Sequence, residues 1–203
     1  MTQTKTGTAA VIFDLGRVLF DFDWGIAMQR LRGRIRPDPQ DFYHLLAEHP
    51  DNIALEDGTL TAAEFFKRWL DFAGFNGSVA EFIEIWCNIF QPIEKNLQLL
   101  QECVHRPDLQ TAFLSNTNPA HIEWLRPRTP IFDQVDHVFL SFEQGLRKPD
   151  PAFYQRLLKT MQLGAGQCVF IDDLAANCQA ARKLGIRSIQ YTGQDLSLEQ
   201  ILY

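Results

Sequence analysis

The sequence predicts an α/β fold in which a five-stranded parallel sheet carries helices on both faces and an all-helical region follows the first strand. The later part of the chain alternates helical segments with short apolar runs, a pattern typical of βαβ units. Before this alternation, roughly 80 residues have only helical periodicity. A chain of 203 residues is long enough for one substantial core and a small inserted domain.

The first strand is expected at residues 9–14, a short apolar run that ends in Asp14. A buried parallel strand of this kind brings its last side chain to the carboxyl edge of the sheet, where open α/β folds bind their ligands. Asp14 is therefore the first candidate functional residue.

The segment after this strand is predicted to be helical. Helices are expected at 23–36 and 39–49, with Pro37 and Pro50 as the breaks after them. A helical region inserted directly after the first strand is placed to act as a lid over the edge of the sheet.

Two capping boxes, Thr61-x-x-Glu64 and Ser78-x-x-Glu81, predict the starts of two further helices. Aromatic residues recur at helical spacing along both segments: Phe65, Trp69, Phe82 and Trp86. Such a stripe is typical of the core of a small helical bundle and not of a cofactor site.

From Pro92 onward the chain reads as alternating helices and strands. A helix at 93–105 precedes the apolar runs 111–114, 138–140, 168–171 and 187–191, which helices near 119–126, 151–162 and 174–184 separate. Right-handed crossovers between such runs make a parallel sheet with helices on both faces. Together with the first strand, the runs give five strands.

Polar side chains stand where these strands end. Asp14 ends the first strand, Ser115 and Asn116 follow the second, Lys148 comes after the third, and the pair Asp172-Asp173 ends the fourth. The carboxyl ends of parallel strands meet at one edge, so a carboxylate, a hydroxyl, an ammonium group and a carboxylate pair are expected in one crevice.

The composition excludes several classes of partner. A net charge of −6 and a pI near 5.3 argue against binding to nucleic acid, which needs clustered Lys and Arg. No apolar run has the length of a membrane span, and Met1–Thr8 has no apolar core of a signal peptide, so we expect a cytoplasmic protein without a membrane partner. The four cysteines form no CxxC pair and are expected to be reduced. The oligomeric state is left open.

Four short motifs resemble those of the haloacid dehalogenase (HAD) superfamily. They are Phe13-Asp14-Leu15-Gly16, Phe113-Leu114-Ser115-Asn116, Arg147-Lys148-Pro149 and Phe170-Ile171-Asp172-Asp173. The resemblance covers essentially the whole chain. It implies a Rossmann-like core of residues 1–20 and 91–203 with strand order 3-2-1-4-5, and a helical C1-type cap of residues 21–90. The motifs are also similar to those of bacterial phosphatases that act on α-D-glucose 1-phosphate.

The resemblance implies Mg²⁺-dependent hydrolysis of a small phosphate monoester. Asp14 would attack phosphorus and form an aspartyl phosphate. The Ser115 hydroxyl and the backbone N–H of Asn116 would donate to phosphoryl oxygens, and Lys148 would place a positive charge beside them. The expected partner is a small phosphorylated metabolite.

Charge counting supports a metal in this scheme. Three carboxylates, those of Asp14, Asp172 and Asp173, face only one ammonium group, so a phosphate dianion would be repelled without a cation. Mg²⁺ could be held by Asp14, by the backbone carbonyl of Gly16 and by one or both of Asp172 and Asp173. Asn177 either orients this pair by a hydrogen bond from behind the metal ligands or is a simple amide on a helix surface.

Gly16 departs from the family pattern, in which most phosphatases have a second aspartate at this position as general acid and base. An acidic leaving group such as the anomeric hydroxyl of a sugar 1-phosphate would explain the loss best. Alternatively, the hinge or cap supplies the proton, with Asp21 and Asp23 as the nearby candidates, although Asp21 is more simply a hinge or helix-capping group. In the third explanation the protein is not a phosphatase.

Arg17 is the other departure, because small residues are common at this position. Its guanidinium either contacts the phosphate or sugar of the substrate or lies across the aromatic surface of the cap.

Other functions on the same fold remain as alternatives. A 2-haloacid dehalogenase also lacks the acid at this position, but it uses no Mg²⁺ and lacks adjacent aspartates such as Asp172-Asp173. A phosphomutase would need the proton transfer that Gly16 cannot provide. A non-catalytic protein that binds a phosphorylated ligand would have no reason to keep a buried anionic cluster.

Overall fold

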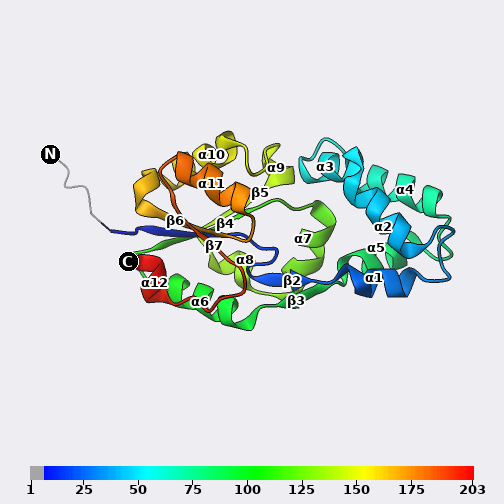
Figure 1. Cartoon of the computed structure of the whole chain (residues 1–203), viewed down its shortest axis with the longest axis horizontal. Helices are drawn as coiled ribbons and strands as arrows, with labels where there is room; N and C mark the ends of the chain where they lie inside the picture. The colour runs from blue at the N-terminus through cyan, green and yellow to red at the C-terminus, as the bar shows by residue number, and fades with distance from the viewer. Residues whose placement is uncertain (1–6) are drawn as a thin grey trace.

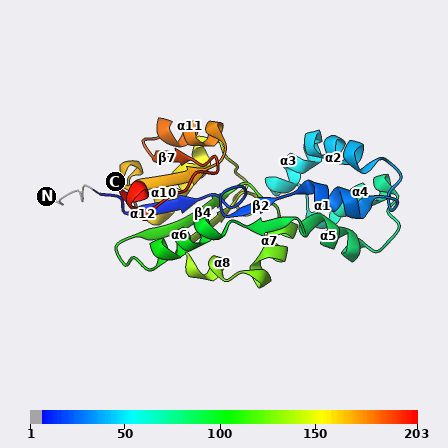
Figure 2. The same ribbon diagram turned by 60° about the horizontal axis from the view of Figure 1, so that its bottom comes forward.

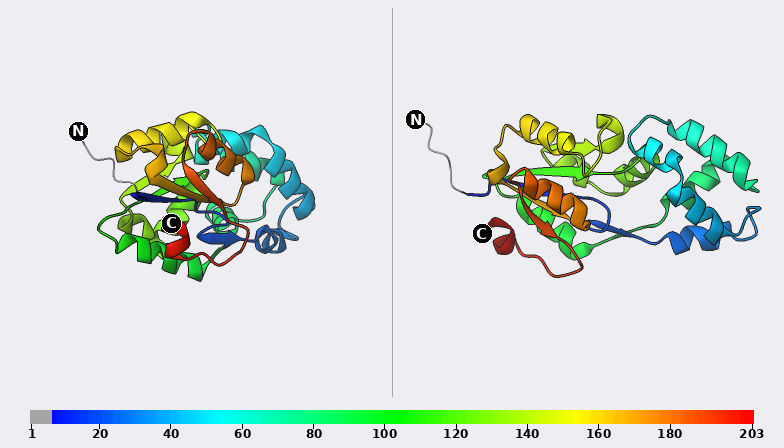
Figure 3. Two further views of the ribbon diagram at one scale, coloured as in Figure 1. Left: turned by 60° about the vertical axis from the view of Figure 1, so that its left-hand side comes forward. Right: turned by 45° about the horizontal axis from the view of Figure 1, so that its top comes forward.

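The computed structural model describes residues 7–203, so the first six residues of the predicted core segment lie outside the described part. The described chain forms a sheet-containing core and a group of helices at one end of it (Figure 1). The C-terminus and the start of the described chain lie at the opposite end of the core (Figure 3).

The core contains one parallel sheet of five strands. These are β1 (Ala10–Phe13), β4 (Gln110–Ser115), β5 (His137–Leu140), β6 (Cys168–Asp172) and β7 (Arg187–Gln190). Their order across the sheet is β5-β4-β1-β6-β7, which is 3-2-1-4-5 when these five are numbered along the chain. All four neighbouring pairs are parallel. The predicted α/β fold with a five-stranded parallel sheet is confirmed.

Helices cover both faces of this sheet (Figure 2). One face packs against α10 (Pro151–Met161) and α11 (Ala175–Lys183), and the other against α6 (Glu94–Val104), α7 (Pro119–Leu125), α8 (Ile131–Gln134) and α12 (Leu198–Leu202). Alternate residues of β1 pack against the two layers of helices. Ala10 and Ile12 face the layer of α10 and α11, and Val11 and Phe13 face the other layer. Burial of β1 on both faces explains its uninterrupted apolar sequence. Short helical segments complete the core: η1 (Arg126–Arg128), α9 (Ser141–Gln144) and η2 (Ala165–Gln167).

The inserted region is all-helical. It consists of α1 (Trp24–Leu31), α2 (Pro39–Glu48), α3 (Pro50–Glu56), α4 (Ala62–Ala73) and α5 (Val79–Cys87). Both predicted capping boxes are present at the starts of α4 and α5. The aromatic stripe is buried in a hydrophobic cluster of its own, separate from the two clusters of the sheet. These helices form the cap of the fold.

Two helix boundaries in the cap differ from the prediction. The first helix ends at Leu31 and not at Arg36, and Gly33 just beyond it has φ of +74°, which a helix cannot contain. Pro50 begins a helix where we expected a break. Proline is tolerated at a first helical position because its missing N–H has no intrahelical partner there, and His49 caps the same turn.

A second, two-stranded sheet joins the cap to the core and was not predicted. β2 (Phe20–Phe22) and β3 (Phe90–Pro92) are antiparallel and carry the two crossings of the chain. The predicted domain limits, 20/21 and 90/91, fall inside these strands, and the division into residues 1–20 with 91–203 and residues 21–90 stays a prediction. No helix of the described residues has the length and apolar composition needed to cross a membrane.

Candidate active site

The register of the sheet brings the predicted polar residues to one edge. Phe13 of β1 pairs with Phe113 of β4 and with Ile171 of β6, so Asp14 and Asp172 lie at the same level of the sheet and Ser115 lies one position further along its strand. Asp14, Ser115 and Asp172 are all buried there. The cap lies beyond the same carboxyl edge (Figure 1).

Lys148 lies between two of these carboxylates. Its Nζ is 2.9 Å from Oδ2 of Asp14 and 2.7 Å from Oδ2 of Asp172, and only 1% of its side chain is exposed. The side chain of Asn116 fixes the backbone of Lys148: its Oδ1 accepts the Lys148 N–H at 2.7 Å and its Nδ2 donates to the Lys148 carbonyl at 2.9 Å. These two hydrogen bonds connect the loop after β4 to the loop that carries Lys148.

Asp172 is saturated by contacts within the protein. Besides Lys148, it accepts hydrogen bonds from the backbone N–H of Leu174 at 2.8 Å and from Nδ2 of Asn177, at 3.0 and 3.1 Å to its two oxygens. Asn177 is buried on α11, so it is not a surface amide. Within residues 7–203, Asp173 has no such set of partners and is only half-buried, which leaves its carboxylate freer than that of Asp172.

Burial dominates the electrostatics of this edge. It raises the pKa of Asp14 to about 7, with Asp172 acting in the same direction and Lys148 and Ser115 opposing it. The pKa of Asp173 is also raised, first by burial and then by Asp172. Burial alone would lower the pKa of Lys148, but Asp14 and Asp172 raise it above its ordinary value. The site therefore holds more negative charge than its lysine compensates.

The donors at this edge fit a magnesium ion. One carboxylate oxygen from each of Asp14, Asp172 and Asp173 lies within 4.8 Å of the others. The carbonyl of Gly16 accepts no hydrogen bond from any described residue. An all-oxygen donor set with surplus negative charge is the chemistry that Mg²⁺ prefers.

Gly16 lies against the ring of Phe22. A Cβ placed on Gly16 would be 3.1 Å from Cε1 of Phe22, which is a tight contact, so the ring would have to shift by a few tenths of an ångström to admit a side chain. The absence of an acid at this position is therefore accompanied by an aromatic ring that packs closely against Gly16.

Arg17 contacts two residues of β2, Asp21 and Phe22. Its Nη1 is 2.7 Å from Oδ1 of Asp21, and its guanidinium lies 4.3 Å from the centre of the Phe22 ring. Both members of this ion pair are about half exposed. Asp23 caps α1 by accepting the N–H of Gly25. The two carboxylates considered as proton donors thus have structural contacts, and Arg17 lies on an aromatic ring.

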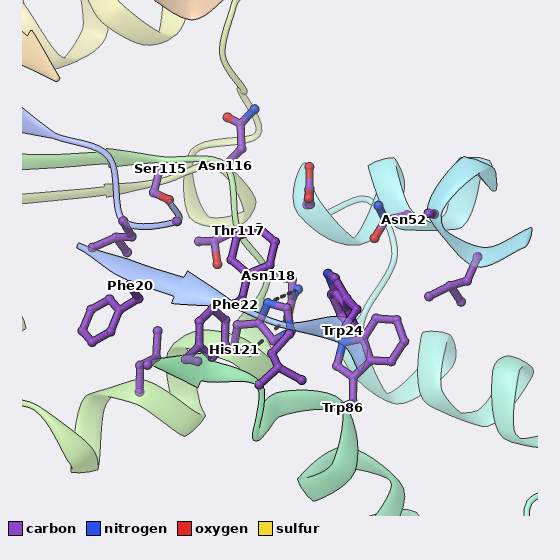
Figure 4. A pocket seen from close by; sticks show the side chains of 18 of the residues that line it. Phe20, Phe22, Trp24, Asn52, Trp86, Ser115, Asn116, Thr117, Asn118 and His121 are labelled. Carbon is purple, nitrogen blue, oxygen red and sulfur yellow. Dashed lines mark hydrogen bonds between the residues drawn. The ribbon is translucent and has the colours of Figure 1, made fainter. Parts of the chain in front are cut away.

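A pocket of about 200 Å³ opens between this edge and the cap. Figure 4 shows aromatic side chains along one part of it and polar side chains from the loop after β4 and from α3 along another. The aromatic wall comprises Phe22, Trp24, Trp86 and Phe90, and the polar groups from the cap are Tyr43, Asn52 and Glu56. Gly16, Ser115 and Asn116 line the same pocket, so it adjoins the predicted catalytic residues.

The sequence did not indicate that these three polar cap residues belong to the site. Glu56 binds Arg147, the neighbour of Lys148, with Nη2 and Oε2 2.7 Å apart. The two residues are 91 positions apart, and no local pattern relates them. The only usable signal was that any polar residue near the end of a cap helix can face the site.

His121 also lines the pocket and was not predicted. Its Nδ1 is 3.0 Å from Nδ2 of Asn118, a contact drawn in Figure 4. Burial lowers the pKa of His121 to about 4, so its imidazole is neutral at physiological pH. Its place beside Trp24, Trp86 and Phe90 makes it part of the aromatic wall.

Comparison with known proteins agrees with this geometry. A model of the haloacid dehalogenase-like hydrolase family matches residues 8–185. A D-ribitol-5-phosphate phosphatase from Bacteroides thetaiotaomicron is 28% identical over 190 residues, which cover 89% of this chain and 90% of the relative. The sesquiterpene phosphatase astK from Aspergillus oryzae is 27% identical over 200 residues, covering 90% and 89% respectively.

The fold is also similar to that of a solved structure. A HAD family enzyme from Bacteroides thetaiotaomicron, in complex with magnesium and inorganic phosphate, has a TM-score of 0.83 against this chain at 25% sequence identity. The similarity covers 94% of this chain and 98% of the other.

Proposed function

Because the chain belongs to the haloacid dehalogenase-like hydrolase family, we propose that it is a Mg²⁺-dependent phosphatase of a phosphorylated sugar or polyol, with a sugar 1-phosphate as the leading substrate. The resemblance drawn from the four motifs is confirmed, and the chain is a hydrolase of phosphate esters. The observation that carries the proposal is the buried contact of Lys148 with both Asp14 and Asp172 at the edge of the sheet.

In the proposed reaction, a carboxylate oxygen of Asp14 attacks phosphorus and the bond from phosphorus to the leaving oxygen breaks. The leaving alkoxide takes up a proton and departs as an alcohol. Water then attacks the phosphorus of the aspartyl phosphate, which releases inorganic phosphate and restores the Asp14 carboxylate. Lys148 and the Ser115 hydroxyl stabilise the charge that spreads over the phosphoryl oxygens. Asn116 holds the backbone of Lys148 in place for this role.

Asp14, the Gly16 carbonyl and Asp173 would hold the magnesium ion. Asp172 would contribute less directly, because its oxygens already bind Lys148, Asn177 and the backbone of Leu174. When bound, Mg²⁺ supplies positive charge that offsets the carboxylates and the phosphate dianion. Asn177 and Tyr154 support the arrangement, since Tyr154 donates to the Asn177 carbonyl at 3.1 Å.

The choice of leaving group follows from Gly16 and Phe22. With an aromatic ring in place of an acid, the site provides no proton donor two residues after Asp14. The anomeric oxygen of a sugar 1-phosphate is a better leaving group than an ordinary alkoxide and needs less protonation. The pocket supports a sugar or polyol because it combines aromatic and polar walls.

A profile of phosphate esters tests this proposal. We expect release of phosphate from p-nitrophenyl phosphate and from sugar 1-phosphates in Mg²⁺, its loss in chelator, and slower release from esters of primary alcohols. Equal rates on acidic and primary-alcohol leaving groups would contradict the explanation of Gly16. Chloride release from 2-chloropropionate without metal would instead favour a dehalogenase, and phosphate binding without metal-dependent turnover would favour a binding protein.

A further inference from the structure

One face of α3 presents to the pocket polar groups whose capacity for hydrogen bonds is not filled by the described part of the chain. Asn52 and Glu56 are four residues apart on this helix, so they share a face, and both line the pocket with Tyr43 of α2. Among residues 7–203, the Asn52 carboxamide and the Tyr43 hydroxyl have no hydrogen-bond partner. Figure 4 shows Asn52 projecting from α3 beside the pocket.

Glu56 is fixed on one side and free on the other. Its Oε2 accepts a hydrogen bond from Nη2 of Arg147 at 2.7 Å, while its Oε1 has no partner in the described chain. Burial raises the pKa of Glu56, and the charges of Arg147 and Lys148 oppose this shift. Glu56 and Arg147 therefore form an ion pair between the cap and the loop that carries Lys148. Oε1 of Glu56 stays available as a hydrogen-bond acceptor.

The backbone holds this face of α3 close to the core. Gly58, with φ of +78°, lies so close to the carbonyl of Phe142 in α9 that a Cβ could not be accommodated. Because both partners in this approach are backbone, neither can rotate away. The turn that follows Glu56 is thus packed closely against α9 of the core.

We propose that Oε1 of Glu56 accepts a hydrogen bond from a hydroxyl group on the leaving group, and that Arg147 is the positioning residue that holds Glu56 for this contact. The inference rests on the proposed function and specifies how the site selects a hydroxylated substrate. The aromatic wall covers the carbon skeleton, while Glu56 and Asn52 pair with its hydroxyls.

A hydrocarbon leaving group would bind poorly in this arrangement. It would bury the free oxygen of Glu56 and the amide of Asn52 without partners, which costs binding energy and makes such sites reject analogues that lack the hydroxyl. The inference therefore favours a sugar or polyol phosphate over an isoprenoid phosphate.

Matched substrate pairs test the role of Glu56. Glucose 1-phosphate is compared with cyclohexyl phosphate, and ribitol 5-phosphate with pentyl phosphate, because the members of each pair are of similar size and only one of them carries several hydroxyls. The first pair also differs in leaving-group acidity, so the effect of a variant is taken as the ratio of its kcat/KM to that of the wild type on the same ester. In the Glu56→Gln variant the one acceptor oxygen of the amide pairs with Arg147, so its NH2 group faces the substrate and the charged acceptor is lost. We therefore expect kcat/KM to fall roughly 10- to 100-fold on the hydroxylated member that the wild type prefers. On the alkyl member we expect a fall of less than about threefold.

Two further variants complete the experiment. Arg147→Gln should give the same substrate-dependent loss, because Glu56 is no longer held. Glu48→Gln removes the same charge from an exposed position of the cap outside the pocket and should leave both rates unchanged. Turnover of the alkyl esters shows in each case that the variant is folded and active.

The outcomes separate the inference from the function on which it rests. Equal losses on both members of a pair, or no loss on either, would overturn the role of Glu56 and leave the phosphatase in place. A wild type that prefers the alkyl members would overturn it as well. Absence of Mg²⁺-dependent phosphate release from all four esters would overturn the proposed function and this inference together.

Discussion

The ring of Phe22 packs closely against Gly16, with 3.1 Å between Cε1 of Phe22 and the position of a Cβ on Gly16. Phe22 belongs to β2, one of the two strands that connect the cap to the core. A side chain two residues after Asp14 would therefore meet this ring, and the ring would have to move to admit it.

This packing predicts how the site responds when an acid is introduced. Gly16→Asp alone should not improve turnover of primary-alcohol phosphates, because the new side chain meets Phe22. The double variant Gly16→Asp with Phe22→Ala has room for the carboxyl, and we expect its rate on these esters, relative to p-nitrophenyl phosphate, to rise at least about tenfold, the lower range for a positioned general acid. Phe22→Ala alone is the control. An equal rise in the single Gly16→Asp variant would show that Phe22 does not restrict this position.

Asp14→Asn should abolish turnover. A carboxamide cannot replace the nucleophilic carboxylate, so we expect less than about 1% of the wild-type kcat, while the thermal unfolding midpoint does not fall because one charge leaves a crowded anionic cluster. Activity and unfolding are measured on the same preparation. Asp195→Asn, at an exposed ion pair with Lys95, should keep wild-type activity. Retention of more than a few per cent of activity by Asp14→Asn would remove Asp14 as the nucleophile.

Magnesium should stabilise the folded chain as well as activate it. An ion that binds only the folded state at 100 times its Kd adds about 2.7 kcal/mol, which for a chain of this size raises the unfolding midpoint by roughly 5–10 °C. Differential scanning fluorimetry with Mg²⁺ and with chelator measures the shift. In Asp173→Asn the shift should be much smaller. A shift that is unchanged in Asp173→Asn would show that the ion binds elsewhere.

His121 should make the protein less stable in mild acid. Its pKa is about 4 in the folded chain and near 6.5 when unfolded, so between these values only the unfolded chain is protonated at this residue. The free energy of unfolding should therefore fall as the pH drops from 6.5 toward 4, by at most about 3 kcal/mol from this group.

Urea unfolding at several pH values measures this slope, and His121→Gln should reduce it. His44→Gln, at an exposed residue of α2, is the matched control and should retain the wild-type slope. The same slope in His121→Gln and the wild type would exclude His121 as its source.

The sequence was sufficient for the core because its signals are local. β1 is an apolar run that ends in Asp14, the capping boxes at Thr61 and Ser78 mark two helix starts, and parallel strands necessarily meet at one edge. The contacts of Lys148 with Asp14 and Asp172 follow from that topology. Each of these features depends on residues near one another in the chain or on a general rule of α/β folds.

The parts that could not be predicted depend on packing between distant segments. Three-residue strands such as β2 and β3 have too little periodicity to recognise, and their pairing joins residues far apart in the chain. The meeting of Glu56 with Arg147 depends in the same way on how the cap sits on the core. Pro50 was misread because proline is compatible with both the end and the beginning of a helix.

The pairing of β2 with β3 has a mechanical consequence. The two crossings are hydrogen-bonded to one another, with Phe20 opposite Pro92 and Phe22 opposite Phe90, so the cap is attached by a ribbon and not by two independent tethers. A ribbon of this kind bends out of its plane but resists shear within it, because shear breaks the hydrogen bonds between its strands. We therefore expect any movement of the cap to follow the bend of this ribbon, and its closed position to be the one in which Glu56 contacts Arg147. Since Phe22 is part of the ribbon, the same bend also shifts the ring that covers Gly16.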